Sequence, residues 1–278
     1  MPDVHNLNPA AGGRPVGQFD GTKASPARIY NYLLGGKDNF KADRDAAEDV
    51  ESRLPTVREM MRENRAFLGR VVWFLATECG IRQFLDIGSG LPTQGNVHEI
   101  AQQAAPDARV VYVDNDPIVL THGRALLATN ERTTVLTADL RAPDSILSHP
   151  HLWELIDPDK PVAVLLVAVL HFIPDQDKPT ELVRTFRSWA APGSYLALSH
   201  VDHTPQVVSA AQVYERATSP AVPRSRGEVE EFFGKFDLVS PGLVQVSAWR
   251  PYGRFKRRVD VPWWGGVARH PGAGVTDV

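Results

Sequence analysis

An aspartate and two glycines follow a short apolar stretch near the middle of the chain. The run is Asp86-Ile87-Gly88-Ser89-Gly90, and its glycines allow the backbone to approach a ligand closely and to turn into a helix. The next apolar stretch ends at Asp114, where a carboxylate can accept hydrogen bonds from both ribose hydroxyls of an adenosine. Together the two motifs predict a nucleoside site, although the glycine run alone also fits an ordinary turn.

These two motifs suit either a nicotinamide dinucleotide or S-adenosylmethionine, because both ligands carry an adenosine. A dinucleotide site usually has a third glycine beside the pyrophosphate, whereas this loop continues with Leu91-Pro92-Thr93. Asp86, directly before the glycines, suits a cationic ligand better than a pyrophosphate. The residues therefore favour the sulfonium cofactor and leave a nicotinamide-dependent oxidoreductase as the alternative.

A third motif follows the next expected strand. The Asp139 carboxylate could accept a hydrogen bond from the adenine amine, while the backbone N–H of Leu140 meets a ring nitrogen. The alternative for Asp139 is a turn before Arg141. Asn115, next to Asp114, is expected to be a further cofactor contact.

Two histidines stand just past the fourth and fifth expected strands. Either His171 or His200 could act as a general base, whereas a single histidine is more often structural. His171 is also included among the expected cofactor contacts. We assign no catalytic residue.

Alternating strands and helices from Arg82 onward must position these residues. Connections of this kind give a parallel sheet with helices on both faces, and ligands bind beyond the carboxyl ends of its strands. The apolar run 162–170 is too short to cross a membrane and fits a buried strand. Strands are predicted at 83–87, 109–113, 135–136, 162–167 and 195–199, and helices at 94–105, 117–128 and 178–189.

The segment before this sheet is expected to be helical and could fold over the cofactor as a lid. One helix should begin at Ser25-Pro26 and end at Gly35-Gly36, a second should cover 42–53, and a third carries an apolar stripe from Val57 to Leu75. Alternatively, the segment only packs against the sheet. Its candidate cofactor contacts are Arg28, Tyr30, Gly36 and Asn39.

Asn64 interrupts the apolar stripe of the third helix, and a polar group there must find a partner. Asn64 and the neighbouring Arg65 either reach the carboxylate of a methionine tail or tie the helix to the sheet. A guanidinium pairs well with a carboxylate, so we favour contact with the cofactor.

The C-terminal region contains Ser225-Arg226-Gly227-Glu228, a capping-box spacing that should open a helix through Phe233. Stretches 236–239 and 243–246 flank a Ser-Pro-Gly turn and predict a strand hairpin. We expect disordered tails at 1–24 and 269–278, a helical cap at 25–79 and a Rossmann-like domain at 80–268.

The composition narrows the functional classes. The 278 residues carry a net charge of -3, which offers no general basic surface for nucleic acid. A single cysteine excludes an intramolecular disulfide, no His or Cys group has metal-ligand spacing, and no secretory signal is apparent. We expect a cytoplasmic protein that binds a small-molecule acceptor, no metal and no membrane; the oligomeric state is not predicted.

The three motifs resemble the nucleotide-contact motifs of class I S-adenosylmethionine-dependent methyltransferases. More narrowly, stretches 25–30, 34–40, 64–68 and 84–96 resemble an actinobacterial methyltransferase family whose substrates are largely unassigned. The resemblance implies a Rossmann-like α/β fold with seven strands, the last antiparallel and the last two supplied by the 236–246 hairpin. It also implies the product S-adenosylhomocysteine. A regulatory protein that binds the cofactor without turnover is the alternative.

Overall fold

The computed structural model describes residues 20–92, 95–127, 130–251 and 260–272. Most of the two expected tails, residues 1–19 and 273–278, lies outside these ranges, as does Gln94, which was expected to begin a helix. Residues 20–24 belong to the folded protein, because Ala24 is buried and its carbonyl accepts a hydrogen bond from the backbone N–H of Thr218.

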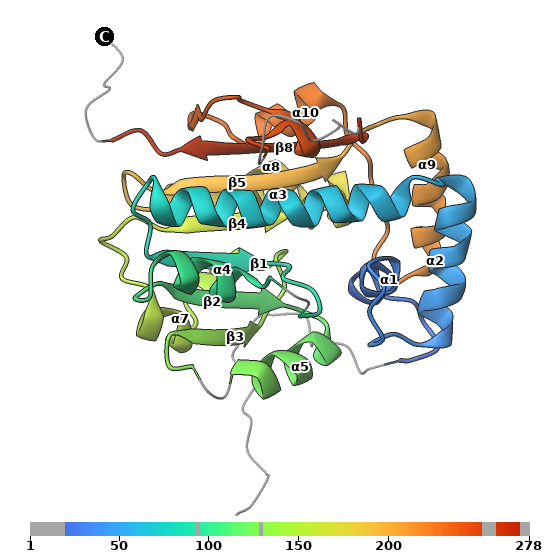
Figure 1. Cartoon of the computed structure of the whole chain (residues 1–278), viewed down its shortest axis with the longest axis horizontal. Helices are drawn as coiled ribbons and strands as arrows, with labels where there is room; N and C mark the ends of the chain where they lie inside the picture. The colour runs from blue at the N-terminus through green and yellow to red at the C-terminus, as the bar shows by residue number, and fades with distance from the viewer. Residues whose placement is uncertain (1–19, 93–94, 128–129, 252–259, 273–278) are drawn as a thin grey trace, which may run out of the picture.

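A single mixed sheet forms the centre of the molecule (Figure 1). Its order is β3-β2-β1-β4-β5-β8-β6, and β7 also pairs with β8. Strands β1 to β5 are parallel, whereas β8 is antiparallel to β5. The strands are β1 Gln83–Ile87, β2 Arg109–Asp114, β3 Thr133–Thr137, β4 Ala163–Val167, β5 Tyr195–Val201, β6 Asp237–Leu238, β7 Val244–Gln245 and β8 Trp263–Arg269.

The helices agree with most of the predicted ranges. Helix α1 ends before Gly35, whose φ of +88° suits a residue without a side chain. The Ser225 capping box that opens α10 is present as predicted. The helices are α1 Pro26–Leu33, α2 Lys41–Arg53, α3 Val57–Thr77, α4 Val97–Ala104, α5 Pro117–Leu127, α6 Pro143–Leu147, α7 Pro150–Leu155, α8 Pro179–Trp189, α9 Pro205–Ala211 and α10 Arg226–Glu231.

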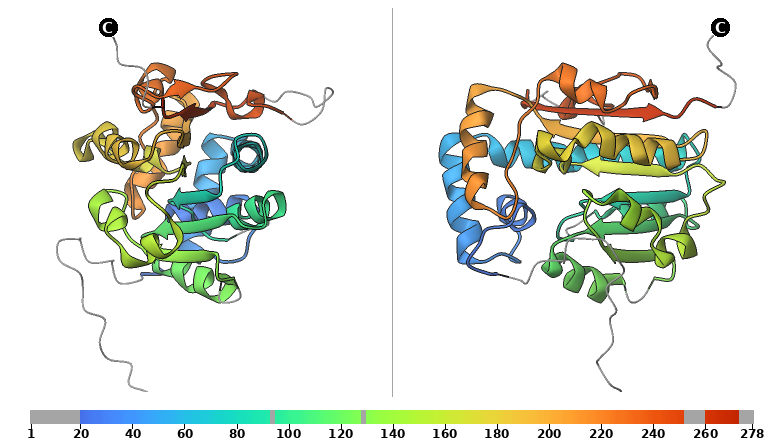
Figure 2. Two further views of the ribbon diagram at one scale, coloured as in Figure 1. Left: turned by 90° about the vertical axis from the view of Figure 1, so that its left-hand side faces the viewer. Right: turned by 180° about the vertical axis from the view of Figure 1, so that it is seen from behind.

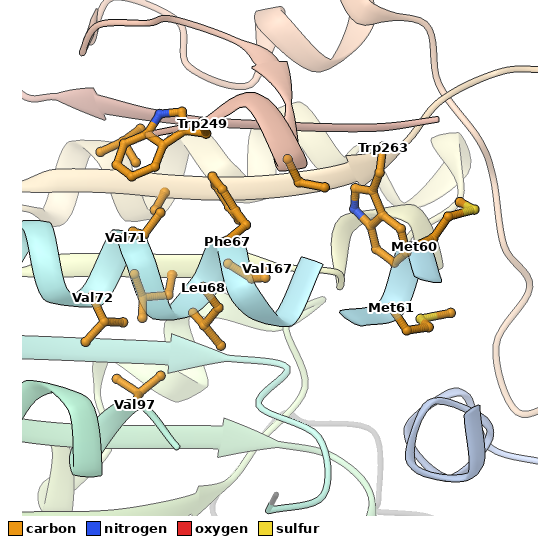
Figure 3. Packing of buried hydrophobic residues seen from close by; sticks show 14 of the residues in the cluster. Met60, Met61, Phe67, Leu68, Val71, Val72, Val97, Val167, Trp249 and Trp263 are labelled. Carbon is orange, nitrogen blue, oxygen red and sulfur yellow. The ribbon is translucent and has the colours of Figure 1, made fainter. Parts of the chain in front are cut away.

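Both faces of the sheet are covered, and alternate residues of each strand enter different cores. On β1, Phe84 packs on the side of α3 and α4, while Leu85 and Ile87 pack on the side of α8. Figure 2 shows these two helical layers. On the first side, Phe67 of α3 meets Trp249 edge-on at 5.6 Å between ring centroids (Figure 3). The central strand β4, Ala163–Val167, is buried at every position and continuously apolar, as expected of a strand covered on both faces.

The last two strands differ from the predicted hairpin. Strands β6 and β7 do not pair with each other; both pair with β8, which was not predicted. The tryptophans and glycines of β8 lack polar alternation because both faces of this strand are covered, and it continues to Arg269, one residue into the expected tail. The final strand is antiparallel as the resemblance implied, but it is Trp263–Arg269.

Helices α1, α2 and α9 lie beyond the carboxyl ends of the parallel strands (Figure 1). Helix α3 instead runs back along the sheet and packs on α4. The expected cap is thus completed by α9, from the far end of the chain. No helix in the described part of the chain combines the length and apolar character needed to cross a membrane.

Candidate cofactor site

A cavity of about 410 Å³ lies between the carboxyl ends of the parallel strands and the cap. Strand order reverses between β1 and β4, and open α/β sheets bind ligands at such a point. The cavity brings together residues from both halves of the chain. The expected cofactor contacts that line it are Arg28, Tyr30, Asn64, Arg65, Asp86, Gly88, Gly90, Asp114, Asn115, Asp139 and Leu140.

The glycine loop after β1 has the conformation that its sequence indicates. Gly88 and Gly90 have φ of +74° and +66°, which residues with side chains rarely adopt. A Cβ on Gly88 would lie 2.3 Å from Val169 Cγ2, so the loop after β4 also requires glycine there. The N–H of Gly90 donates to Asp114 Oδ2 at 2.8 Å. This bond joins the ends of β1 and β2 into one rigid edge.

Asp86 is a buried acid whose carboxylate has no partner among the described residues. Its side chain is 5% exposed, and within the described ranges no hydrogen bond or ion pair reaches its carboxylate. Burial raises the pKa of Asp86 to about 7; the Arg65 charge opposes this shift and the Asp114 charge adds to it. An unpaired carboxylate facing a cavity favours a cationic ligand.

Asp114 is also buried, but backbone groups orient it. Its Oδ1 accepts from Asp116 N–H at 2.9 Å, and its Oδ2 accepts from Gly90. Burial raises the pKa of Asp114 to about 6, against the opposing effect of these backbone hydrogen bonds. Each carboxylate oxygen retains acceptor capacity, so the group can still bind two hydroxyls.

Asp139 already has partners within the protein. Its Oδ1 accepts from the backbone N–H and from Nε of Arg141, both at 2.9 Å, and Asn115 Nδ2 donates to Oδ2 at 3.3 Å. Burial raises the pKa of Asp139, but the hydrogen bonds and charge of Arg141 outweigh burial and lower it. The turn that was the alternative for Asp139 is therefore formed, and Leu140 lies buried beside it in the cavity wall.

Arg28 fastens α1 to the sheet. Its Nε pairs with Asp43 at 2.9 Å, its Nη1 pairs with Asp116 at 3.0 Å, and its Nη2 donates to the Lys23 carbonyl at 2.7 Å. The Ser25 side chain makes no capping hydrogen bond at the start of the helix. Its hydroxyl instead donates to Asp116 Oδ2 at 2.7 Å. The guanidinium nitrogens that were expected to meet the cofactor are thus engaged inside the protein.

A second, uncharged chain of hydrogen bonds joins the cap to the sheet. Asn64 Nδ2 donates to the Tyr30 hydroxyl at 3.0 Å, and Ser199 Oγ donates to Asn64 Oδ1 at 2.6 Å. The Ala168 N–H donates to Ser199 Oγ at 3.0 Å and holds Ala168 at φ +58°, a strained conformation in the cavity wall. The tie between helix and sheet that was the alternative for Asn64 is therefore formed, and Asn64 also lines the cavity.

Arg65 retains a free donor. Its Nη2 donates to the Gly95 carbonyl at 3.0 Å, whereas its Nε is buried and has no hydrogen-bond partner among the described residues. Such a buried donor is costly unless something binds it. Arg65 is therefore the member of this pair that still suits an anionic group.

The two histidines do not line the cavity. His200 Nδ1 donates to the Val201 carbonyl at 2.8 Å and its Nε2 accepts from Arg224 at 3.1 Å, so the ring is neutral and both nitrogens are engaged. Burial lowers the pKa of His200 to about 3. Burial above all, with the nearby Arg224 charge adding to it, lowers the pKa of His171 well below its usual value. Both contribute to packing, which contradicts the expected cofactor contact of His171 and a base role for either histidine.

Gly36 and Asn39 also lie outside the cavity wall. Both contact Asn31, a buried residue that lines the cavity and that sequence reasoning missed. Asn31 belongs to one face of α1 with Ala27 and Tyr30, at helical spacing, and this spacing could have identified it. Phe172 and Thr218, also missed, line the cavity from the loop after β4 and from the segment after α9.

Comparison with known families distinguishes between the two ligand classes. The S-adenosyl methyltransferase family matches residues 14–271. The chain belongs to this family. A nicotinamide-dependent oxidoreductase, the alternative that the glycine loop allowed, is thereby set aside, and S-adenosylmethionine is the cofactor of the family.

Two solved structures from actinobacteria are similar over nearly their whole length. A protein of Thermobifida fusca with a provisional methyltransferase description is 44% identical, with a TM-score of 0.86 over 90% of this chain and 96% of the other. A DUF574 family protein of Streptomyces avermitilis is also 44% identical, with a TM-score of 0.85 over 90% and 98%. The class I methyltransferase fold is therefore shared by close relatives.

A curated relative is more distant. Trans-aconitate 2-methyltransferase of Methylobacterium radiotolerans is 29% identical over 61% of this chain. The match spans 60% of the length of that relative.

Proposed function

We propose that this protein transfers the methyl group of S-adenosylmethionine to a small-molecule acceptor in the cavity beneath α1, releasing S-adenosylhomocysteine. The observation that carries the proposal is the pair of buried aspartates, Asp86 and Asp114, which face this cavity without a cationic partner in the described structure. Family membership then names the cation that suits them. The cavity volume, about 410 Å³, falls in the range of small-molecule sites.

The residues present fit this cofactor. In the proposal Asp86 faces the positive charge of the ligand, Asp114 binds the ribose hydroxyls with Asn115 beside it, and Asp139 with Leu140 borders the adenine. The buried Nε of Arg65 suits the methionine carboxylate. Gly90 leaves the loop backbone open to the ligand, since a Cβ there would meet nothing within 4 Å, whereas Gly88 allows Val169 to pack against the loop.

The bound cofactor supplies a methyl carbon activated by the sulfonium. The protein contributes orientation and exclusion of water, which can supply much of the rate enhancement. Tyr30, Ala168 and Phe172 border the cavity and would position an acceptor there. The Asn64–Ser199 hydrogen bond holds Tyr30 and Ala168 in fixed relation, so the acceptor side of the cavity is preorganised.

The acceptor is proposed to be a metabolite that enters past the cap. Residues 25–79 then supply the cap and residues 80–268 the cofactor-binding domain. The distant relative named for trans-aconitate makes small carboxylic acids the first acceptors to test. A cytoplasmic location and an actinobacterial source are part of the same proposal, the latter supported by the origins of the two similar structures.

Calorimetric titration with S-adenosylmethionine tests the proposal. We expect the wild-type protein to bind and Asp114→Ala to weaken binding by about 100-fold or more, because charged hydrogen bonds to two ligand hydroxyls are lost. Asp237→Ala, at an exposed position on the far edge of the sheet, is the matched control and should bind normally. A wild-type protein without affinity would refute the cofactor site.

A second assay separates an enzyme from a regulatory protein that binds the cofactor without turnover. Incubation with S-adenosylmethionine and a pool of metabolites, including tricarboxylic acids, should produce S-adenosylhomocysteine above the level found without the pool. Tight binding with no turnover over many acceptor classes would favour the regulatory function.

A further inference from the structure

Asn31 of α1 has an amide group that the protein holds in one orientation. Its side chain is 2% exposed, and its Oδ1 accepts hydrogen bonds from Asp38 N–H at 3.1 Å and from Asn39 Nδ2 at 3.0 Å. A backbone N–H requires an acceptor, so the atom facing Asp38 is the oxygen. Asn39 Nδ2 also donates to the Gly36 carbonyl at 3.0 Å, which fixes the orientation of the second amide.

The nitrogen of the same amide has no such partner. In the part of the chain that the structure describes, nothing accepts a hydrogen bond from Asn31 Nδ2, yet Asn31 lines the cavity. Gly36 packs directly on this amide, because a Cβ on Gly36 would lie 2.3 Å from Asn31 Nδ2. Gly36 and Asn39 therefore orient the Asn31 amide, and its Nδ2 is a donor that a ligand in the cavity can use.

The position of α1 indicates which part of a ligand this donor meets. Ser25 and Arg28 bind Asp116, two residues past Asp114 at the end of β2. Farther along, Asp38 Oδ1 lies 3.8 Å from Nε2 of His122 on α5, the helix that follows β2. The start of α1 is thus fixed to the end of β2, the loop after α1 lies beside α5, and α1 faces the ends of β1 and β2 (Figure 1).

We propose that Asn31 is a cofactor-binding residue whose amide N–H donates a hydrogen bond to an acceptor atom of the adenosine half of the ligand. This inference rests on the proposed function, since it assumes that S-adenosylmethionine occupies the cavity. It also assigns a purpose to Gly36 and Asn39, which act as positioning residues for Asn31. The cap therefore contributes to cofactor affinity as well as covering the site.

The test is calorimetric binding of S-adenosylhomocysteine and of 5′-methylthioadenosine, which keeps the adenosine but lacks the amino acid. Asn31→Asp preserves the acceptors for Asp38 and Asn39 but removes the donor, and should weaken both ligands by about 3- to 10-fold. Gly36→Ala should weaken them similarly by displacing the amide, since Gly36 does not need a left-handed backbone. Lys37→Ala, exposed in the same loop, is the control and should bind as wild type.

Thermal unfolding of each variant shows whether the fold is kept. Folded Asn31→Asp and Gly36→Ala proteins that bind both ligands within about twofold of wild type would overturn the inference and leave the proposed function intact. Weaker binding of S-adenosylhomocysteine alone would overturn the assignment to the adenosine half. A wild-type protein that binds neither ligand would overturn the proposed function and this inference with it.

Discussion

Four buried aspartates lie near the junction of the cap and the sheet, and they form two contrasting pairs. Asp43 and Asp116 share the guanidinium of Arg28, at 2.9 and 3.0 Å. Asp86 and Asp114 have no ion pair with any residue that the structure describes, and burial raises their pKa values to about 7 and about 6. Asp86, Asp114 and Asp116 lie at or just past the ends of β1 and β2, and Asp43 lies on α2 of the cap, yet only the pair that contacts Arg28 is neutralised by the protein.

This difference indicates that one pair of acids stabilises the fold and the other pair is available to bind a ligand. A buried charge must be paired or must shift its pKa. Arg28 neutralises the first pair and thereby attaches α1 to the sheet, so these two acids have a structural role. The second pair stays costly until a ligand brings a cation to Asp86 and hydrogen-bond donors to Asp114, so these acids are the ones available to a ligand. Substitutions at either pair can test this assignment of roles.

The largest effect is expected at the paired acids. Arg28→Met leaves two buried carboxylates without their cation and should lower the free energy of unfolding by about 3–5 kcal/mol. Urea denaturation measures this. Lys41→Met is the control, because the Lys41–Asp45 pair is exposed and such pairs contribute little. If both variants lose equally little unfolding free energy, the ion pairs of Arg28 do not stabilise the attachment of α1 to the sheet.

The unpaired acids should give a pH-dependent affinity. A cationic ligand binds the ionised form of Asp86, whose pKa is about 7 in the free protein. Binding of S-adenosylmethionine should therefore strengthen as pH rises through 7, with about a tenfold loss per pH unit below it. In Asp86→Asn this component should disappear and the affinity at pH 8 should fall. Titration calorimetry from pH 5.5 to about 8.5 measures both, and identical profiles would contradict the role of Asp86.

The same shift also affects stability. The pKa of Asp86 is raised above the value of 3.8 that it has when unfolded, so the unliganded protein binds more protons than the unfolded chain between these values. Its contribution to stability is fully present below pH 3.8 and is lost as pH rises through about 7. Asp86→Asn should flatten this part of the profile.

Loss of the uncharged hydrogen bond between Asn64 and Ser199 should lower the unfolding free energy by the smallest amount. Ser199→Ala leaves the buried Asn64 Oδ1 without its donor and should cost about 1–3 kcal/mol in unfolding free energy. Ser52→Ala, an exposed serine on α2, should change stability by less than about 0.5 kcal/mol. Chemical denaturation of both variants measures the difference in unfolding free energy. Equal values would contradict a stabilising role for the Asn64–Ser199 hydrogen bond.

Local pattern was sufficient for most elements and for the position of the site. Strand β1 occupies its expected residues, and the glycine loop, Asp114 and Leu140 lie around one cavity because parallel strands carry their carboxyl ends to one edge. The pattern did not predict β8, because Trp263–Arg269 has no polar alternation. Its partners are β5, which is distant in sequence, and the two-residue strands β6 and β7. Strand pairing of that kind is set by tertiary contact.

The residue types and their order along the chain determined which polar groups stand at the ends of the strands, because hydrophobic periodicity defines elements and parallel βαβ connections align their ends. Only the tertiary structure decided which of those groups are already satisfied. Asn64 and Ser199 are 135 residues apart, and Arg28 and Asp116 are 88 apart. Hydrogen-bond partners at such separations meet only when the cap docks. Docking left the Asp86 carboxylate, Arg65 Nε and Asn31 Nδ2 without a hydrogen-bond partner among the described residues.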